Sequence, residues 1–107
     1  MALPQTKPLD RIIVSIERDL EDIVPVFLNN RRKDLLTIRT ALSQQDFETI
    51  KTLGHRMRGD GGGYGFDEIG RIGTIMETAA ARGDRFTIDA QAKQLEDFLA
   101  RVHVEYR

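Results

Sequence analysis

The stretch FETIKTLGHRMRGDGGGYGF, residues 47–66, combines an apolar helical pattern with a cluster of glycines. Its apolar residues recur at three- and four-residue steps, which predicts a helix with one buried face: Phe47, Ile50, Leu53 and Met57. Five glycines occupy the seven positions from 59 to 65. Each glycine inside a helix costs ~1 kcal/mol relative to alanine. The glycines therefore indicate that another part of the molecule or another molecule approaches the backbone closely there.

Three further helices are expected around this one. An upstream helix begins near residue 18, with Pro25 in its first turn or at a kink, and the spacing of Ser43 and Asp46 resembles a capping box at its end. A third helix runs from about Asp67 to Gly83, a candidate left-handed cap, and a fourth starts near Thr87. The apolar positions of these three helices are Phe27, Leu28, Leu35, Ile38 and Leu42; Ile69, Ile72, Ile75, Met76 and Ala79; and Ile88, Ala92, Leu95, Leu99 and Val102.

Four amphipathic helices with short connections favour an all-α fold, an antiparallel up-down four-helix bundle with a short N-terminal extension. We expect residues 18–107 to form the bundle and residues 1–17 to precede it as a tail or extended segment, loose over Met1–Pro8. The β-branched segment RIIVSIE, residues 11–17, fits a strand across the body of the domain or the start of a helix.

The composition is that of a small globular domain. The 107 residues carry a net charge of −1, which argues against a nucleic-acid binder, and the basic run at residues 31–33 reads as a solvated helix face. There is no cysteine, so disulfides and thiolate metal sites are excluded. No apolar stretch approaches the ~18 residues of a membrane span, and the N-terminus does not resemble a signal peptide. We therefore expect a cytoplasmic protein with no membrane contact.

The histidine in the quoted stretch falls outside the buried face. Successive helical residues turn by ~100°, which places His55 roughly 140° from the centre of the apolar face. Its neighbours on the outer face include Lys51, Gly59 and Gly62. A solvated surface histidine is the ordinary alternative, but bare backbone beside an exposed imidazole is what close approach by another molecule requires.

Other histidine chemistries lack support. A metal site needs three or four converging ligands, and the second histidine, His103, lies near the far end of the chain, so we expect no metal. The glycines match neither a P-loop nor a dinucleotide-binding pattern. Phosphoryl transfer remains, because a neutral imidazole has a free ring-nitrogen lone pair and can act as a nucleophile. Arg58 would neutralise charge beside the phosphoryl group, and Lys51 is a weaker candidate for that role.

At these residues the sequence resembles a histidine-containing phosphotransfer (Hpt) domain. The family motif has the form H-x-[LM]-K-G, and here it reads His55-Arg56-Met57-Arg58-Gly59, with arginine in place of the usual lysine. Asp60 and its glycine neighbours replace the more usual small Ser or Ala residues, so Asp60 should point away from the phosphate or pair with Arg58. The resemblance extends over about residues 18–103.

The resemblance implies a phosphocarrier in a two-component phosphorelay, without kinase activity or cofactor of its own. His55 would accept the phosphoryl group from a receiver aspartate or a histidine kinase and pass it to a response regulator. The receiver would supply Mg²⁺ and dock over Lys51, Gly59 and Gly62 on a monomeric domain. By analogy with the chemotaxis-kinase branch, Glu77 would orient the imidazole, unless it is simply a solvated glutamate. A non-catalytic helical adaptor and a regulatory or dimerisation bundle, in which the glycines only ease helix packing, are the alternatives.

Overall fold

The structure, a computed structural model, describes residues 10–107. The loose tail expected for Met1–Pro8 lies outside the described residues. Four helices account for most of the chain: α1 (Val24–Ser43), α2 (Phe47–Gly63), α3 (Asp67–Ala81) and α4 (Arg85–Arg101). A short 3₁₀ helix, η1 (Arg18–Leu20), precedes α1, and the strands β1 (Ile12–Ile16) and β2 (Val102–Tyr106) flank the helices. The predominance of helix expected from the sequence is confirmed.

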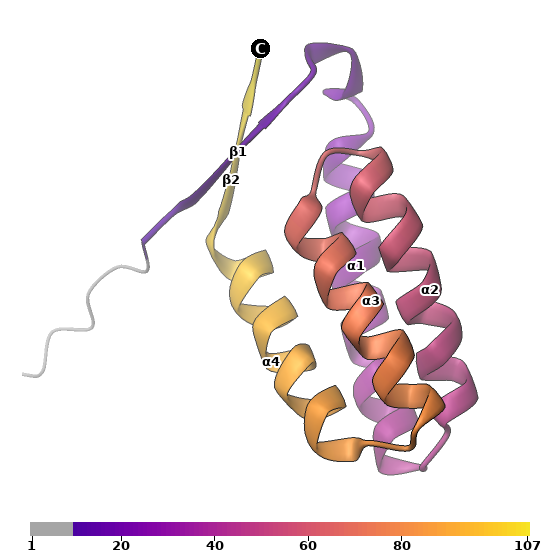
Figure 1. Ribbon diagram of the computed structural model, residues 1–107. Helices are drawn as coiled ribbons and strands as arrows, with labels where there is room; N and C mark the ends of the chain where they lie inside the picture. The colour runs from indigo at the N-terminus through magenta and orange to yellow at the C-terminus, as the bar shows by residue number, and fades with distance from the viewer. Residues whose placement is uncertain (1–9) are drawn as a thin grey trace, which may run out of the picture.

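Short turns join the helices, and the chain reverses direction at each of them (Figure 1). α2 and α4 both begin after an aspartate whose side chain accepts a hydrogen bond from the backbone N–H three residues later, Thr49 for Asp46 and Thr87 for Asp84. The hydroxyl of the same threonine also donates to each aspartate, and this bond, together with the backbone bond, lowers the pKa of both carboxyl groups. Gly83 has φ +65°, as expected for the residue after α3.

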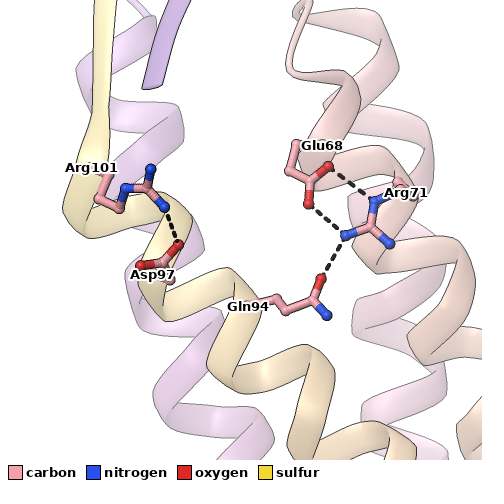
Figure 2. A network of polar contacts seen from close by, with 5 residues as sticks. All are labelled: Glu68, Arg71, Gln94, Asp97 and Arg101. Atoms are coloured by element: carbon pink, nitrogen blue, oxygen red, sulfur yellow. Dashed lines mark hydrogen bonds and ion pairs between the residues drawn. The ribbon is translucent and has the colours of Figure 1, made fainter. Parts of the chain in front are cut away.

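The core is a single apolar cluster to which all four helices contribute. Phe66, in the turn between α2 and α3, stacks on Phe27 of α1 with ring centroids 5.2 Å apart and meets Phe98 of α4 edge-on at 6.5 Å. Polar bonds tie α3 to α4 at the surface, where Arg71 binds Glu68 and donates to Gln94 at 2.6 Å (Figure 2). The core therefore fixes how α2 and α3, which carry the candidate site, lie against the rest of the domain.

Residues 10–107 are not all-helical, because the two ends of this part of the chain form a small parallel sheet. β1 pairs with β2 from Ile12↔Val102 to Ile16↔Tyr106; β2 continues from the end of α4, and one face of the pair packs against the helical core (Figure 1). Of the two conformations open for residues 11–17, the strand is the one observed. The expectation of an all-α fold misses this sheet, since the partner strand of RIIVSIE lies 90 residues away in sequence.

Several local expectations are corrected. Val102 was expected on the last helix but begins β2, because α4 ends at Arg101. Ile75 is only half-buried, so it lies at the margin of the apolar face of α3. The Ser43–Asp46 spacing does mark a helix boundary, but Asp46 is the residue that caps α2. Pro25 stands in the first turn of α1, as one of the two predicted placements requires.

The basic run at residues 31–33 is not a uniformly solvated face, because Arg31 is 7% exposed. Its Nε lies 2.9 Å from Asp34 Oδ2, its Nη1 lies 3.5 Å from Asp60 Oδ2, and its guanidinium sits over the Phe27 ring. Burial raises the pKa of the Asp34 carboxyl, while the adjacent Arg31 opposes that rise. Asp60 therefore pairs with α1 through Arg31, and the sequence pattern gave no sign of this contact.

Candidate functional site

His55 lies in the middle of α2 on the solvent side of the helix, as its helical phase predicts. Its side chain is 65% exposed, while Ile50, Leu53 and Met57 on the opposite side are buried. Phe47, the fourth residue of the predicted apolar face, is half-buried at the start of the helix. The imidazole is therefore open to a second molecule, and it is not a core histidine.

A carboxylate on α3 holds one nitrogen of the ring. His55 Nδ1 lies 2.8 Å from Glu77 Oε2, and Arg58 Nη1 donates to Glu77 Oε1 at 3.2 Å. Glu77 is mostly buried, with 21% of its side chain exposed, whereas the Arg58 side chain is 55% exposed. The three residues singled out in the sequence thus form one bonded group, with the glutamate between the histidine and the arginine.

Close packing of α2 against α3 brings Glu77 within reach of His55. A β-carbon added at Gly54 would lie 2.8 Å from the Glu77 backbone nitrogen and 2.9 Å from the Gly73 carbonyl oxygen. One added at Gly73 would lie 2.6 Å from the Arg58 backbone nitrogen. Only glycine allows two helix backbones to approach this closely. The helices therefore cross at Gly54 and Gly73, immediately beside the candidate site.

The glycines of the quoted stretch divide into two groups. Gly61 faces α3, where an added β-carbon would collide with the backbone of Gly70. An added β-carbon at Gly59 or Gly62 would meet no other atom within 4 Å. Helix packing thus explains Gly61, but it does not explain Gly59 and Gly62, which leave open backbone on the exposed side of α2.

The surroundings of His55 are shallow and polar. A hollow of about 280 Å³ is lined by Glu48, Lys51, Thr52, His55, Arg56 and Glu77. Lys51 is exposed, as expected, and none of the ion pairs within residues 10–107 involves it. Asp60 contacts Arg31 instead of Arg58, so the predicted alternative of an Asp60–Arg58 pair is wrong. A hollow of this size and openness suits the surface of another protein better than an enclosed small molecule.

Two other kinds of site are not found over residues 10–107. No group of three or more His, Cys, Asp or Glu side chains converges as metal ligands would. No helix of this part of the chain is long and apolar enough to cross a membrane. The candidate site consists of charged side chains around one candidate nucleophile, His55.

The crossing glycines were missed in the sequence, although a signal was present. Gly54 and Gly61 are seven residues apart and share the apolar face of α2, and Gly70 and Gly73 stand three residues apart on α3. Small residues repeated at helical spacing on a buried face indicate a close helix contact.

The fold and the site define a helical domain with an exposed histidine bonded to a carboxylate of the neighbouring helix. A family profile described as the Hpt domain matches residues 22–105, and the chain belongs to this family. No curated protein and no solved structure gives a significant match to the chain. Domains of the Hpt family are phosphocarriers in phosphorelay signalling, where they interact with receiver domains and kinases and are generally not kinases themselves.

Proposed function

We propose that this domain is a phosphocarrier that accepts a phosphoryl group on His55 Nε2 and passes it to a receiver domain. The observation that carries the proposal is the exposed imidazole with Nδ1 bonded to a carboxylate. The same geometry would be unusual for a solvated surface histidine, whose ring has no fixed partner. One copy carries the whole site, since His55, Arg58 and Glu77 all come from α2 and α3.

The proposed role of Glu77 is to select the reactive tautomer. An ionised carboxylate can only accept hydrogen bonds, so the proton of the neutral ring stands on Nδ1 and the lone pair on Nε2. Nε2 then points away from Glu77, toward the approaching partner. Glu77 also stabilises the positive charge that the ring acquires when Nε2 bonds to phosphorus.

The proposed transfer step moves only the phosphoryl group. The Nε2 lone pair forms the N–P bond while the P–O bond to the donor aspartate breaks, and the aspartate leaves as a carboxylate. The proton stays on Nδ1 against Glu77 throughout. Because the transition state is loose, positioning and charge neutralisation supply most of the catalysis.

Arg58 and the open glycines are assigned to the contact with the partner. Arg58 bonds Glu77 at 3.2 Å in the structure, and its exposed guanidinium can turn toward a phosphoryl group on Nε2. Gly59 and Gly62 lie one and two turns beyond His55, where a receiver surface can press on bare backbone. Lys51, one turn before His55, adds positive charge to the same docking face.

The remaining features of the proposal follow from the family. The partner receiver supplies Mg²⁺ and the acidic pocket, and this domain needs no cofactor. Its helices form the antiparallel up-down bundle of the family, an arrangement that the chain reversal at each short turn supports (Figure 1). The proposed compartment is the cytoplasm, where phosphorelay partners work.

The test is phosphate uptake from a phosphorylated receiver. We expect acid-labile, base-stable phosphate on the native domain and none on His55→Gln, whose circular dichroism should be unchanged because the residue is exposed. Uptake by His55→Gln would refute the assignment of the carrier residue. A native domain that binds the receiver but takes up no phosphate would instead support the helical adaptor.

A further inference from the structure

The small sheet of β1 and β2 has an apolar residue at its exposed side. Side chains alternate along β1: Ile12, Val14 and Ile16 pack against the helical core, while Ile13 on the other face is 51% exposed. Parallel sheets normally lie buried between other elements, and a sheet of two strands is marginally stable by itself. Over the residues that the structure describes, the helices therefore cover this sheet on one face, and Ile13 stands on the other.

Within residues 10–107, no strand pairs with the edge of β1 opposite β2. Arg107 N–H donates to Ile16 O at 3.1 Å, and Arg18 N–H donates to Arg107 O at 3.2 Å. In a parallel ladder the bonded residues of one strand recur at every second position, so Ile12 and Val14 also face β2. The N–H and C=O groups of Ile13 and Ser15 then point away from β2.

Over the residues that the structure describes, the Arg107 side chain reaches this edge, where its Nη1 donates to Ser15 Oγ at 3.2 Å and its Nη2 donates to Glu17 Oε1 at 3.2 Å. Arg107 Nη1 donates to Ser15 O at 3.0 Å, and that carbonyl has a second lone pair for another donor. The strand itself, IIVSI, contains no charge, proline or bulge of the kind that protects edge strands. Arg101 fixes the start of β1, because its Nε donates to Asp10 O at 2.8 Å while its Nη1 binds Asp97 (Figure 2).

The charges that flank β1 are complementary to themselves in the antiparallel direction. If two copies of β1 pair around a two-fold axis at Val14, Arg11 lies opposite Glu17 of the other copy, the last pair before the chain enters η1 at Arg18. Ile13 then lies opposite Ser15, so the outward N–H and C=O groups of one copy meet those of the other. Opposite charges directly across a strand pair stabilise it, and a two-fold interface requires this self-complementarity.

The free edge of β2 does not share this property. Pairing two copies of β2 around Val104 would place Arg101 opposite Arg107, two like charges, on both sides of the axis. The pattern of charges thus selects the β1 edge.

We propose that β1 is a dimerisation edge, along which two copies of the chain form a continuous four-stranded sheet in the order β2-β1-β1-β2. The inference is independent of the phosphocarrier function and departs from the monomer expected from the sequence. The occupant is a second copy because the charges match in that arrangement. A weak, concentration-dependent dimer is expected, since five residues on each side bury far less than the ~1,600 Å² of a standard interface.

The register is tested by cysteine crosslinking, which is clean because the chain has no native cysteine. In the proposed dimer the two copies of residue 14 form a non-hydrogen-bonded pair with Cα atoms about 4.5 Å apart, within the range of a disulfide. The two copies of residue 13 lie on a diagonal, about 7–8 Å apart, beyond that range. Val14→Cys should therefore crosslink efficiently on mild oxidation, and Ile13→Cys, the matched control, should not.

The charge pattern is tested by sedimentation velocity over a wide range of concentrations. Arg11→Glu should weaken the dimer about tenfold, because it replaces two attractive pairs per dimer with two repulsive ones, and adding Glu17→Arg should restore it. Arg85→Glu, the same charge change at the far end of α4, should have no effect. A native chain that stays monomeric throughout, equal crosslinking of the two cysteine variants, or equal effects of Arg11→Glu and Arg85→Glu would each overturn the proposal.

Discussion

Gly73→Ala should destabilise the domain, although alanine is the better helix former. A β-carbon at this position would lie 2.6 Å from Arg58 N, 2.7 Å from Gly54 O and 2.8 Å from Met57 Cβ. Ordinary contacts begin at 3.4 Å, so α2 and α3 must separate by 3.4 − 2.6 = 0.8 Å. Such overpacking costs ~1–3 kcal/mol, and the gain in helix propensity offsets ~1 kcal/mol of it. At about 4–8 °C per kcal/mol, we expect the melting temperature to fall by several degrees.

The matched control is Gly59→Ala on the neighbouring helix. No atom lies within 4 Å of its added β-carbon, so only the propensity gain remains, and the melting temperature should rise. Thermal unfolding followed by circular dichroism measures both variants. A melting temperature of Gly73→Ala equal to or above that of the native protein would refute the close crossing of α2 and α3.

The same separation of α2 and α3 should break the hydrogen bond between His55 and Glu77. A separation of 0.8 Å along the bond lengthens the 2.8 Å between His55 Nδ1 and Glu77 Oε2 to about 3.6 Å, which is too long for a hydrogen bond. Long-range ¹H–¹⁵N spectra of the imidazole report its tautomer, and Gly73→Ala should lose the preference for the Nδ1–H form. An unchanged tautomer in that variant would show that the crossing does not position Glu77.

Three other substitutions test the site and the helix ends. Arg58→Ala should slow phosphoryl transfer roughly tenfold, while Arg58→Lys should keep most of the rate because it keeps the charge, as receiver-dependent kinetics would show. Gly59→Glu should block transfer through bulk and charge on the docking face without lowering the melting temperature, and a normal rate would mean that no close approach occurs there. Asp46→Ala with Asp84→Ala should lower the melting temperature at neutral pH. The pKa of each capping aspartate is lowered in the folded state, so its contribution to stability is complete at a pH above ~3.9 and is lost as the pH falls through the folded pKa. The difference in melting temperature between the native protein and the double variant should therefore become smaller in acid.

The helices and the exposure of His55 could be predicted from local sequence patterns. The apolar period that places Ile50, Leu53 and Met57 on one side of α2 also places His55 on the other, because both follow from the geometry of one helix. The aspartate caps and the turn at Gly83 are equally local, since each depends on residues a few positions apart.

The buried state of Arg31 could not be predicted in this way. Its sequence neighbours Arg32 and Lys33 are exposed, and a run of three basic residues usually marks a solvated face. Arg31 is buried because Asp34 on its own helix, Asp60 on α2 and the Phe27 ring converge around it. Asp60 is the one of these partners that lies outside α1, and the sequence pattern gives no sign of its contact with Arg31.

The sequence by itself determined the four helices, their buried faces and the histidine that stands outside them, because periodicity and capping act within one element. The tertiary structure decided what surrounds that histidine. Glu77 reaches His55 only because Gly54 and Gly73 let two backbones approach, and β1 is a strand only because β2 lies beside it. These features depend on contacts between residues 19 to 90 positions apart, whose energies arise only when the chain has packed. The spacing of the glycines indicates a close helix contact, but it does not say which helix packs there or which side chains then meet.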